Sequence, residues 1–172
     1  LKNNKFLENS INILKISFLR KQPIVQLRFR FFHKSNKIPK NSCLIMKIIE
    51  IEGIGEKYAK KLIDAGFDQI EELIPLSAKE MDELAEKTGI SRKLIDKWQE
   101  HADLMRIKGV GPEYSDALNQ IGIDSVKEFA LRNPENTLER IKKLDEEKPD
   151  VIRKLPTLNQ VKDWIAQAKK LR

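Results

Sequence analysis

Apolar residues recur every three or four positions along most of residues 46–172, which is the spacing of amphipathic α-helices. Glycine, proline or a small polar residue interrupts this pattern at each break, so it predicts a series of short helices. The expected helix starts lie near Glu56, Asp68, Ser77, Ser91, Pro112, Asp124, Asn133 and Thr157. The second is expected to open with a capping box at Asp68, and the charged stretch 145–149 to be a connector. The pattern predicts an all-α fold.

The helical spacing also assigns individual side chains to the interior or the surface. On the first helix, the expected inward face carries Tyr58, Ala59, Leu62 and Ile63. Trp98 and Trp164 fall on apolar faces and are expected in the core, and His101 is expected at the surface or its boundary. Tyr58 and its counterpart Tyr114 are expected to be packed rings with hydrogen-bonded hydroxyls.

A stretch of twelve residues occurs twice, at 51–62 and at 107–118. Both copies contain a Gly-hydrophobic-Gly turn that opens a helix, and the register continues without a gap to residues 73 and 129. The turns are 56 residues apart but the matching tryptophans are 66 apart, which indicates an insertion of ten residues in the second copy. Each copy is too small to bury a core alone. We therefore expect one compact domain of two tandem repeats, 46–105 and 106–172.

The positive charge of the chain is concentrated before the repeats. Residues 1–45 hold ten Lys or Arg and one acid, which gives 10 − 1 = +9, whereas residues 46–172 hold 23 and 25, which gives 23 − 25 = −2. The repeats therefore gain no support for nucleic-acid binding from overall basicity. Residues 1–45 form a basic, low-complexity leader that we expect to be poorly ordered. One interpretation is translated upstream sequence with Met46 as the true start, and the other is a targeting or membrane-surface arm.

Several classes of function receive no support from the sequence. Cys43 is the only cysteine, so an internal disulfide is excluded, and this fits a reducing compartment such as the cytoplasm. The two histidines lie far apart without a cysteine cluster, which argues against a zinc site. No apolar run in residues 46–172 reaches the ~18–20 residues that a membrane-spanning helix needs. No nucleophile–base pair or set of paired carboxylates is recognisable, so we expect no catalytic residues, no cofactor and no enzyme.

The repeated turn carries a resemblance to a known superfamily. The first copy has the pattern hydrophobic-x-Gly-hydrophobic-Gly-x-x-x-Ala-x-x-Leu, with its fixed positions at Gly53, Ile54, Gly55, Ala59 and Leu62. The second copy keeps Gly109, Val110, Gly111 and Leu118 but has Ser115 where alanine is usual. This pattern resembles the helix-hairpin-helix superfamily. Residues 46–172 as a whole resemble a tandem helix-hairpin-helix family of unknown function.

The resemblance implies a place for a ligand. In DNA-binding members of the superfamily, the hairpin amides hold a backbone phosphate and a nearby Lys or Arg supports them, without reading bases. Such contacts give affinity and salt dependence but no sequence preference. Carried over position by position, this implies a nucleic-acid contact at Gly53, Ile54, Gly55, Lys57, Lys60 and Lys61 in the first copy and at Lys108, Gly109, Val110 and Gly111 in the second.

Acidic residues lie beside the same turns and limit this prediction. Glu56 follows Gly55 directly, and Glu113 and Asp116 lie on the opening turns of the second helix. An acid there stabilises the helix dipole but repels phosphate from the same amides. We therefore expect a small non-enzymatic module that binds DNA weakly and without sequence preference. The alternative is a protein–protein interaction adaptor in which both glycine turns are purely structural. Lysines clustered around residues 53–55 would favour the first hypothesis, and an exposed apolar patch the second.

Overall fold

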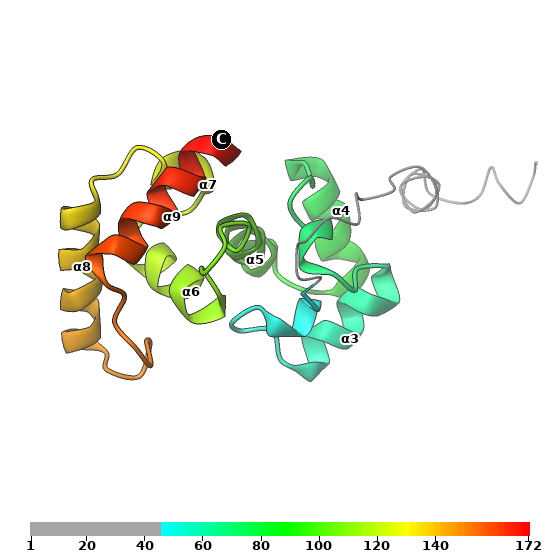
Figure 1. The fold of residues 1–172 in the computed structure, drawn as a ribbon. Coiled ribbons are helices and arrows are strands. Elements are labelled where there is room, and N and C mark those ends of the chain that lie inside the picture. The colour runs from blue at the N-terminus through cyan, green and yellow to red at the C-terminus, as the bar shows by residue number, and fades with distance from the viewer. Residues whose placement is uncertain (1–45) are drawn as a thin grey trace, which may run out of the picture. The chain divides into compact units, whose positions relative to one another are not determined.

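The computed structural model describes residues 46–172, and these residues are helical with no β-strand among them (Figure 1). They belong to one compact unit, Leu44–Arg172. The expectations for the leader at residues 1–45 lie outside the described residues. The elements, in chain order, are the 3₁₀ turn η1 (Ile48–Glu50), α3 (Glu56–Ala65), the 3₁₀ turn η2 (Ile70–Glu72), α4 (Ala78–Thr88), α5 (Arg92–Leu104), α6 (Pro112–Gln120), α7 (Val126–Phe129), α8 (Pro134–Glu147) and α9 (Leu158–Leu171).

The two halves of this unit repeat one order of elements. The series α3, η2, α4 and α5 in the first half corresponds to α6, α7, α8 and α9 in the second. The ten inserted residues are divided between a helix and a connector. Helix α8 has 14 residues against 11 in α4, and the segment before α9 has ten residues (148–157) against three (89–91) before α5. The longer connector lies beside the start of α6, and this position matters for the site below.

The core of the second half is a continuous apolar cluster that also takes in the end of α5. Its fully buried members include Leu104, Ile107, Leu118, Phe129 and Ile141. The first half buries its own set, centred on Leu62, Leu73 and Ile95. Helix α5 packs against α4 on one side and α6 on the other, so it belongs to both halves.

Polar contacts across α5 reinforce its shared position. Glu100 accepts a hydrogen bond from Asn119 Nδ2 at 2.8 Å, and Asp103 accepts one from the Val126 amide at 2.8 Å. Within the first half, Gln99 Nε2 donates to the carbonyls of three residues that follow η2, at 2.8–3.2 Å: Leu73, Ile74 and Leu76. These contacts fix α5 to segments on both sides.

Several expected helix starts are confirmed by their N-caps. Ser77 and Glu80 form a capping box before α4, Thr157 and Gln160 form another before α9, and the Asn133 side chain caps α8. Two starts are displaced by one residue. Gln69 and Ser125 occupy the N-cap positions expected for Asp68 and Asp124, because the Glu72 and Ser125 side chains supply the capping oxygens. Helix α8 also continues through Glu147, beyond the expected start of the charged connector.

Two predictions of side-chain burial are wrong, one for a residue expected inside and one for a residue expected at the surface. Ile63 is 52% exposed, because α3 packs through Ala59, Leu62 and Ala65 and this narrower stripe leaves Ile63 outside it. His101 is fully buried, because α6 covers the face of α5 that carries it. The tryptophan prediction is confirmed, since Trp98 and Trp164 are almost completely buried.

Candidate nucleic-acid interface

The first glycine turn (residues 51–55) and the second glycine turn (residues 107–111) have the same backbone structure. The Ile54 amide donates to Ile51 O at 3.0 Å, and the Val110 amide donates to Ile107 O at 2.9 Å. The four apolar residues of these two bonds are all buried. These buried side chains anchor each turn in the core, and the glycine that lies between them, Gly53 or Gly109, is exposed.

The first glycine of each turn has a structural reason to be glycine. Gly53 has φ +85° and Gly109 has φ +95°, in the left-handed region that side chains disfavour. A Cβ added to Gly109 would lie 2.9 Å from Trp164 Nε1, and one added to Gly53 would lie 3.7 Å from Trp98 Nε1. Each turn therefore rests on the indole of the last helix of its own repeat.

A tyrosine completes each of these packing units. Tyr58 lies against Trp98 with ring centroids 5.4 Å apart, and Tyr114 lies against Trp164 with centroids 4.9 Å apart, both pairs tilted. These are favourable aromatic geometries. The expectation of packed tyrosine rings is confirmed. The predicted hydroxyl bond is confirmed for Tyr114, which donates to Lys154 O at 2.8 Å, but Tyr58 makes none within residues 46–172.

The second glycine of each turn has no such structural reason. Gly55 has φ −78° and Gly111 has φ −95°, which any residue adopts, and each is the N-cap of the helix that follows. A Cβ added to either would meet nothing within 4 Å. Neither backbone strain nor packing within the described residues therefore requires glycine at these positions. A glycine there leaves free space in front of the helix N-terminus.

The second turn is covered by other parts of its own repeat. The Lys108 amide donates to Gln167 Oε1 at 3.0 Å, and Gln167 Nε2 donates back to Lys108 O at 3.2 Å. Pro112 at the first helical position removes one amide that a ligand could use. Glu113 pairs with Arg153 of the long connector, Nε to Oε1 at 2.8 Å. These contacts, together with the Tyr114 hydroxyl bond, tie the second turn and the start of α6 to α9 and to the long connector.

The first turn has no corresponding cover among the described residues. The first amides of an α-helix have no acceptor within the helix, and no side chain caps Gly55. Gly55, Glu56 and Lys57 are all exposed. Within residues 46–172, no hydrogen bond or ion pair engages the side chains of Glu56, Lys57 or Lys60. The start of α3 therefore presents free N–H groups and the positive end of the helix dipole, with two unpaired lysines on its first two turns.

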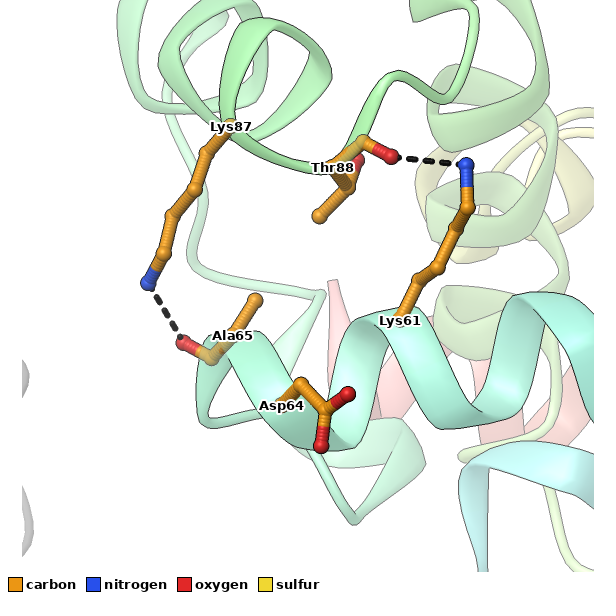
Figure 2. Close-up of a pocket in the computed structure, with 5 residues that line it drawn as sticks. All are labelled: Lys61, Asp64, Ala65, Lys87 and Thr88. Carbon is orange, nitrogen blue, oxygen red and sulfur yellow. Dashed lines mark hydrogen bonds between the residues drawn. The ribbon is translucent and has the colours of Figure 1, made fainter.

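Lys61 points to a different place. Its Nζ donates to Thr88 O at 2.8 Å, while Lys87 Nζ donates to Ala65 O at 3.3 Å. Figure 2 shows this reciprocal arrangement around a shallow pocket of about 310 Å³ that Asp64 also lines. Each lysine satisfies a carbonyl at the C-terminal end of the other residue's helix, where a cation is favoured. The structure thus separates Lys61 from Lys57 and Lys60 and gives it a contact that joins α3 to α4.

His101 occupies the position that Gln167 holds in the second repeat, three residues after the tryptophan. Its two ring nitrogens are buried and have no hydrogen-bond partner among the described residues. Nε2 lies 3.6 Å from Asp116 Oδ1, which also pairs with Lys97 Nζ at 3.1 Å. Burial lowers the pKa of His101 to about 4, and the nearby Asp116 carboxylate offsets this only in part. The imidazole is therefore neutral at neutral pH and packs as a core residue.

The described residues meet the requirements of neither a metal site nor a membrane-spanning helix. No group of three His, Cys, Asp or Glu side chains between residues 46 and 172 is arranged to hold a metal ion. In the same residues, no helix combines the length and the apolar character that a membrane crossing requires.

Comparison with known proteins then places the chain in a family. A family model matches residues 52–171, which is more than two thirds of the chain. The chain belongs to the family described as Domain of unknown function (DUF4332). The DUF4332 match covers the glycines of both turns and both tryptophans, so it includes most of each repeat. Neither the curated proteins nor the solved structures compared with the chain give a match.

Proposed function

We propose that this protein is a non-enzymatic module that binds the phosphate backbone of DNA weakly and without sequence preference, through its first glycine turn. The observation that carries the proposal is Gly55. Its backbone angles and its surroundings would accept a side chain, yet a glycine keeps the approach to the α3 amides clear. A phosphate oxygen suits such a site, because it accepts hydrogen bonds and is attracted by the helix dipole.

The charges around the turn agree with weak binding. Lys57 and Lys60 are exposed and unpaired in the described residues, so they are available to a phosphate. Glu56 opens the same helix and opposes it. The resemblance to the helix-hairpin-helix superfamily supports this use of the turn. Contacts of this kind do not distinguish one base sequence from another.

The alternative, a protein–protein adaptor, has less support on the surface. Five large apolar side chains are exposed in residues 46–172, and they come from five different segments: Ile49, Ile63, Leu131, Leu155 and Leu171. Singly exposed apolar residues are ordinary on protein surfaces. The exposed, uncovered first turn therefore supports the nucleic-acid proposal more than the adaptor.

The test compares two matched substitutions in the full chain, Gly55→Ala and Gly111→Ala. Both add a methyl group at an N-cap with ordinary backbone angles and open surroundings. Residues 1–45 carry a charge of +9 and are identical in both variants, so any contribution of theirs to DNA binding cancels in the comparison. We expect Gly55→Ala to weaken binding of a fluorescent duplex severalfold, and Gly111→Ala to leave it unchanged. Equal affinities for the two variants would refute the site.

A second pair of variants tests the charges. The double variant Lys57→Glu and Lys60→Glu should weaken DNA binding more than Lys142→Glu with Lys143→Glu on α8, which changes the net charge equally. Conversely, Glu56→Gln should strengthen binding, because it removes the acid beside the amides. A rise in affinity is informative here, since a damaged fold would only lower it. Unchanged or weaker binding by Glu56→Gln would count against the proposed contact.

A further inference from the structure

The structure assembles a cluster of cations that no sequence pattern indicates. Arg106 directly precedes the second glycine turn, and Lys108 is the second residue of that turn. Lys169 and Lys170 lie on the last turn of α9, and Arg172 follows the helix. Two contacts bring these segments side by side. Lys108 shares two hydrogen bonds with Gln167, and Arg106 Nη2 donates to Leu171 O at 3.4 Å. We call these five cations the α9 basic cluster.

Most of this cluster is free to meet an anion. All five residues are exposed. The two acids that bond to Arg106 and to Gln167 are already engaged. Asp103 pairs with Arg106 at 2.7 Å and accepts from the Val126 amide, and Asp163 accepts from Gln167 Nε2 at 2.9 Å. Within the described residues, Lys108, Lys169, Lys170 and Arg172 take part in no ion pair. The cluster stands out because residues 46–172 carry a net charge of −2.

Helix-dipole stabilisation alone does not explain the cluster. Cations do favour the C-terminal ends of helices. However, α3, α6 and α8 have no basic residue in their last turns, and α8 ends on acids instead. Moreover, Lys108 and Arg106 do not belong to α9 and yet lie against it. The chain thus gathers charge at this point from two segments about 60 residues apart in sequence.

We propose that the α9 basic cluster is a second contact for the phosphate backbone of nucleic acid, separate from the first glycine turn. This inference rests on the proposed function. In Figure 1 the end of α9 lies at the top of the unit and the start of α3 near its lower edge, so they are separate places on the surface. The second glycine turn then contributes through the Lys108 side chain, while the Lys108 and Val110 amides donate to Gln167 and Ile107 of the protein itself.

Two contacts on one unit have a measurable consequence. A duplex long enough to span both binds more tightly than either contact alone would allow, because the second contact forms within an existing complex. Each lysine that neutralises a phosphate adds about −0.9 to the slope of log affinity against log salt. The α9 basic cluster should therefore contribute its own part of the salt dependence.

The experiment uses the full chain and the double variant Lys169→Gln with Lys170→Gln. Glutamine removes the charges and retains a similar helix propensity. The matched control is Lys142→Gln with Lys143→Gln, also two adjacent exposed lysines, on α8. Figure 1 shows α8 at the left edge of the unit, beside the first part of α9 and away from its C-terminal end. Affinity for a fluorescent duplex of about 30 base pairs is measured at several salt concentrations, and circular dichroism confirms folding.

We expect the Lys169→Gln, Lys170→Gln variant to bind on the order of tenfold more weakly at 0.1 M salt. Its slope of log affinity against log salt should be less steep by about 1.8. The control should change neither measurably. Equal behaviour of variant and control would overturn the inference. Measuring Gly55→Ala alongside separates the two proposals. If Gly55→Ala has no effect but the α9 variant does, the first-turn site fails and the cluster stands. The reverse outcome leaves the first-turn site intact and removes the cluster.

Discussion

Replacing the first glycine of each turn with alanine should destabilise the fold, and by different amounts in the two repeats. Gly53 and Gly109 both have positive φ, so alanine at either position incurs a backbone cost of about 1–2 kcal/mol. At Gly53 the new methyl group would have ordinary contact with Trp98, at 3.7 Å. At Gly109 it would lie 2.9 Å from Trp164 Nε1, which is too close.

The clash at Gly109 sets the difference. The indole of Trp164 is almost fully buried against Tyr114 and cannot move aside freely, so overpacking adds about 1–3 kcal/mol. We therefore expect Gly109→Ala to lower the free energy of unfolding by about 2–5 kcal/mol and Gly53→Ala by about 1–2 kcal/mol. Gly111→Ala should change it by less than about 1 kcal/mol, because the loss of a preferred N-cap and the reduced freedom of the unfolded chain oppose each other.

The assay is urea unfolding followed by far-ultraviolet circular dichroism, which reports helix content and does not depend on the tryptophan that is displaced. The order of stability should be wild type close to Gly111→Ala, then Gly53→Ala, then Gly109→Ala. If Gly109→Ala were no less stable than Gly53→Ala, the packing of Trp164 against its turn would be refuted. If Gly111→Ala were the least stable, the argument that the second glycine is free of structural demands would fail too.

Three further predictions concern single contacts. Burial lowers the pKa of His101 from 6.5 to about 4, so the unfolded chain binds a proton at this residue more tightly than the folded protein does. The folded protein is therefore destabilised as the pH falls from 6.5 toward 4, and this effect is absent above pH 6.5. The loss is at most about 3 kcal/mol, and His101→Gln should remove it from the pH dependence of urea midpoints, whereas an unchanged profile would show that other groups cause it. Gln99→Ala leaves three carbonyls without their donor and should cost about 1–3 kcal/mol; a neutral result in thermal unfolding would mean that water replaces the amide. Lys61→Met should lower the melting temperature but not DNA affinity, and a loss of affinity would return Lys61 to the binding site.

Much of the fold could be predicted from the sequence because its signals are local. Helical spacing and capping residues such as Ser77 and Thr157 mark the helices, and the repeated glycine turn marks the two halves. The paired tryptophans were also recognisable, since both fall on apolar faces at the same place in each copy. The environment of His101 was not, because its burial depends on how one repeat packs against the other.

The difference between the two turns likewise needed the structure. The ten inserted residues were visible in the sequence, but no local pattern indicates that they lie beside the start of α6. That position follows from the contacts of Glu113 with Arg153 and of Tyr114 with Lys154. The same limit applies to the α9 basic cluster, whose residues are brought together by the contacts of Lys108 with Gln167 and of Arg106 with Leu171. Lys61 could not be separated from Lys57 and Lys60 until its bond to Thr88 was seen.

The most direct test of the central claim is a titration of the ¹⁵N-labelled full chain with a short DNA duplex, followed through its backbone amide signals. The claim concerns the amides at the start of α3, and each amide gives its own signal. The account predicts progressive shifts at Gly55, Glu56 and Lys57 that disappear at high salt, with Gly111 and Glu113 unaffected. Shifts that leave the α3 amides unchanged, or equal shifts at the first amides of α3 and α6, would contradict it.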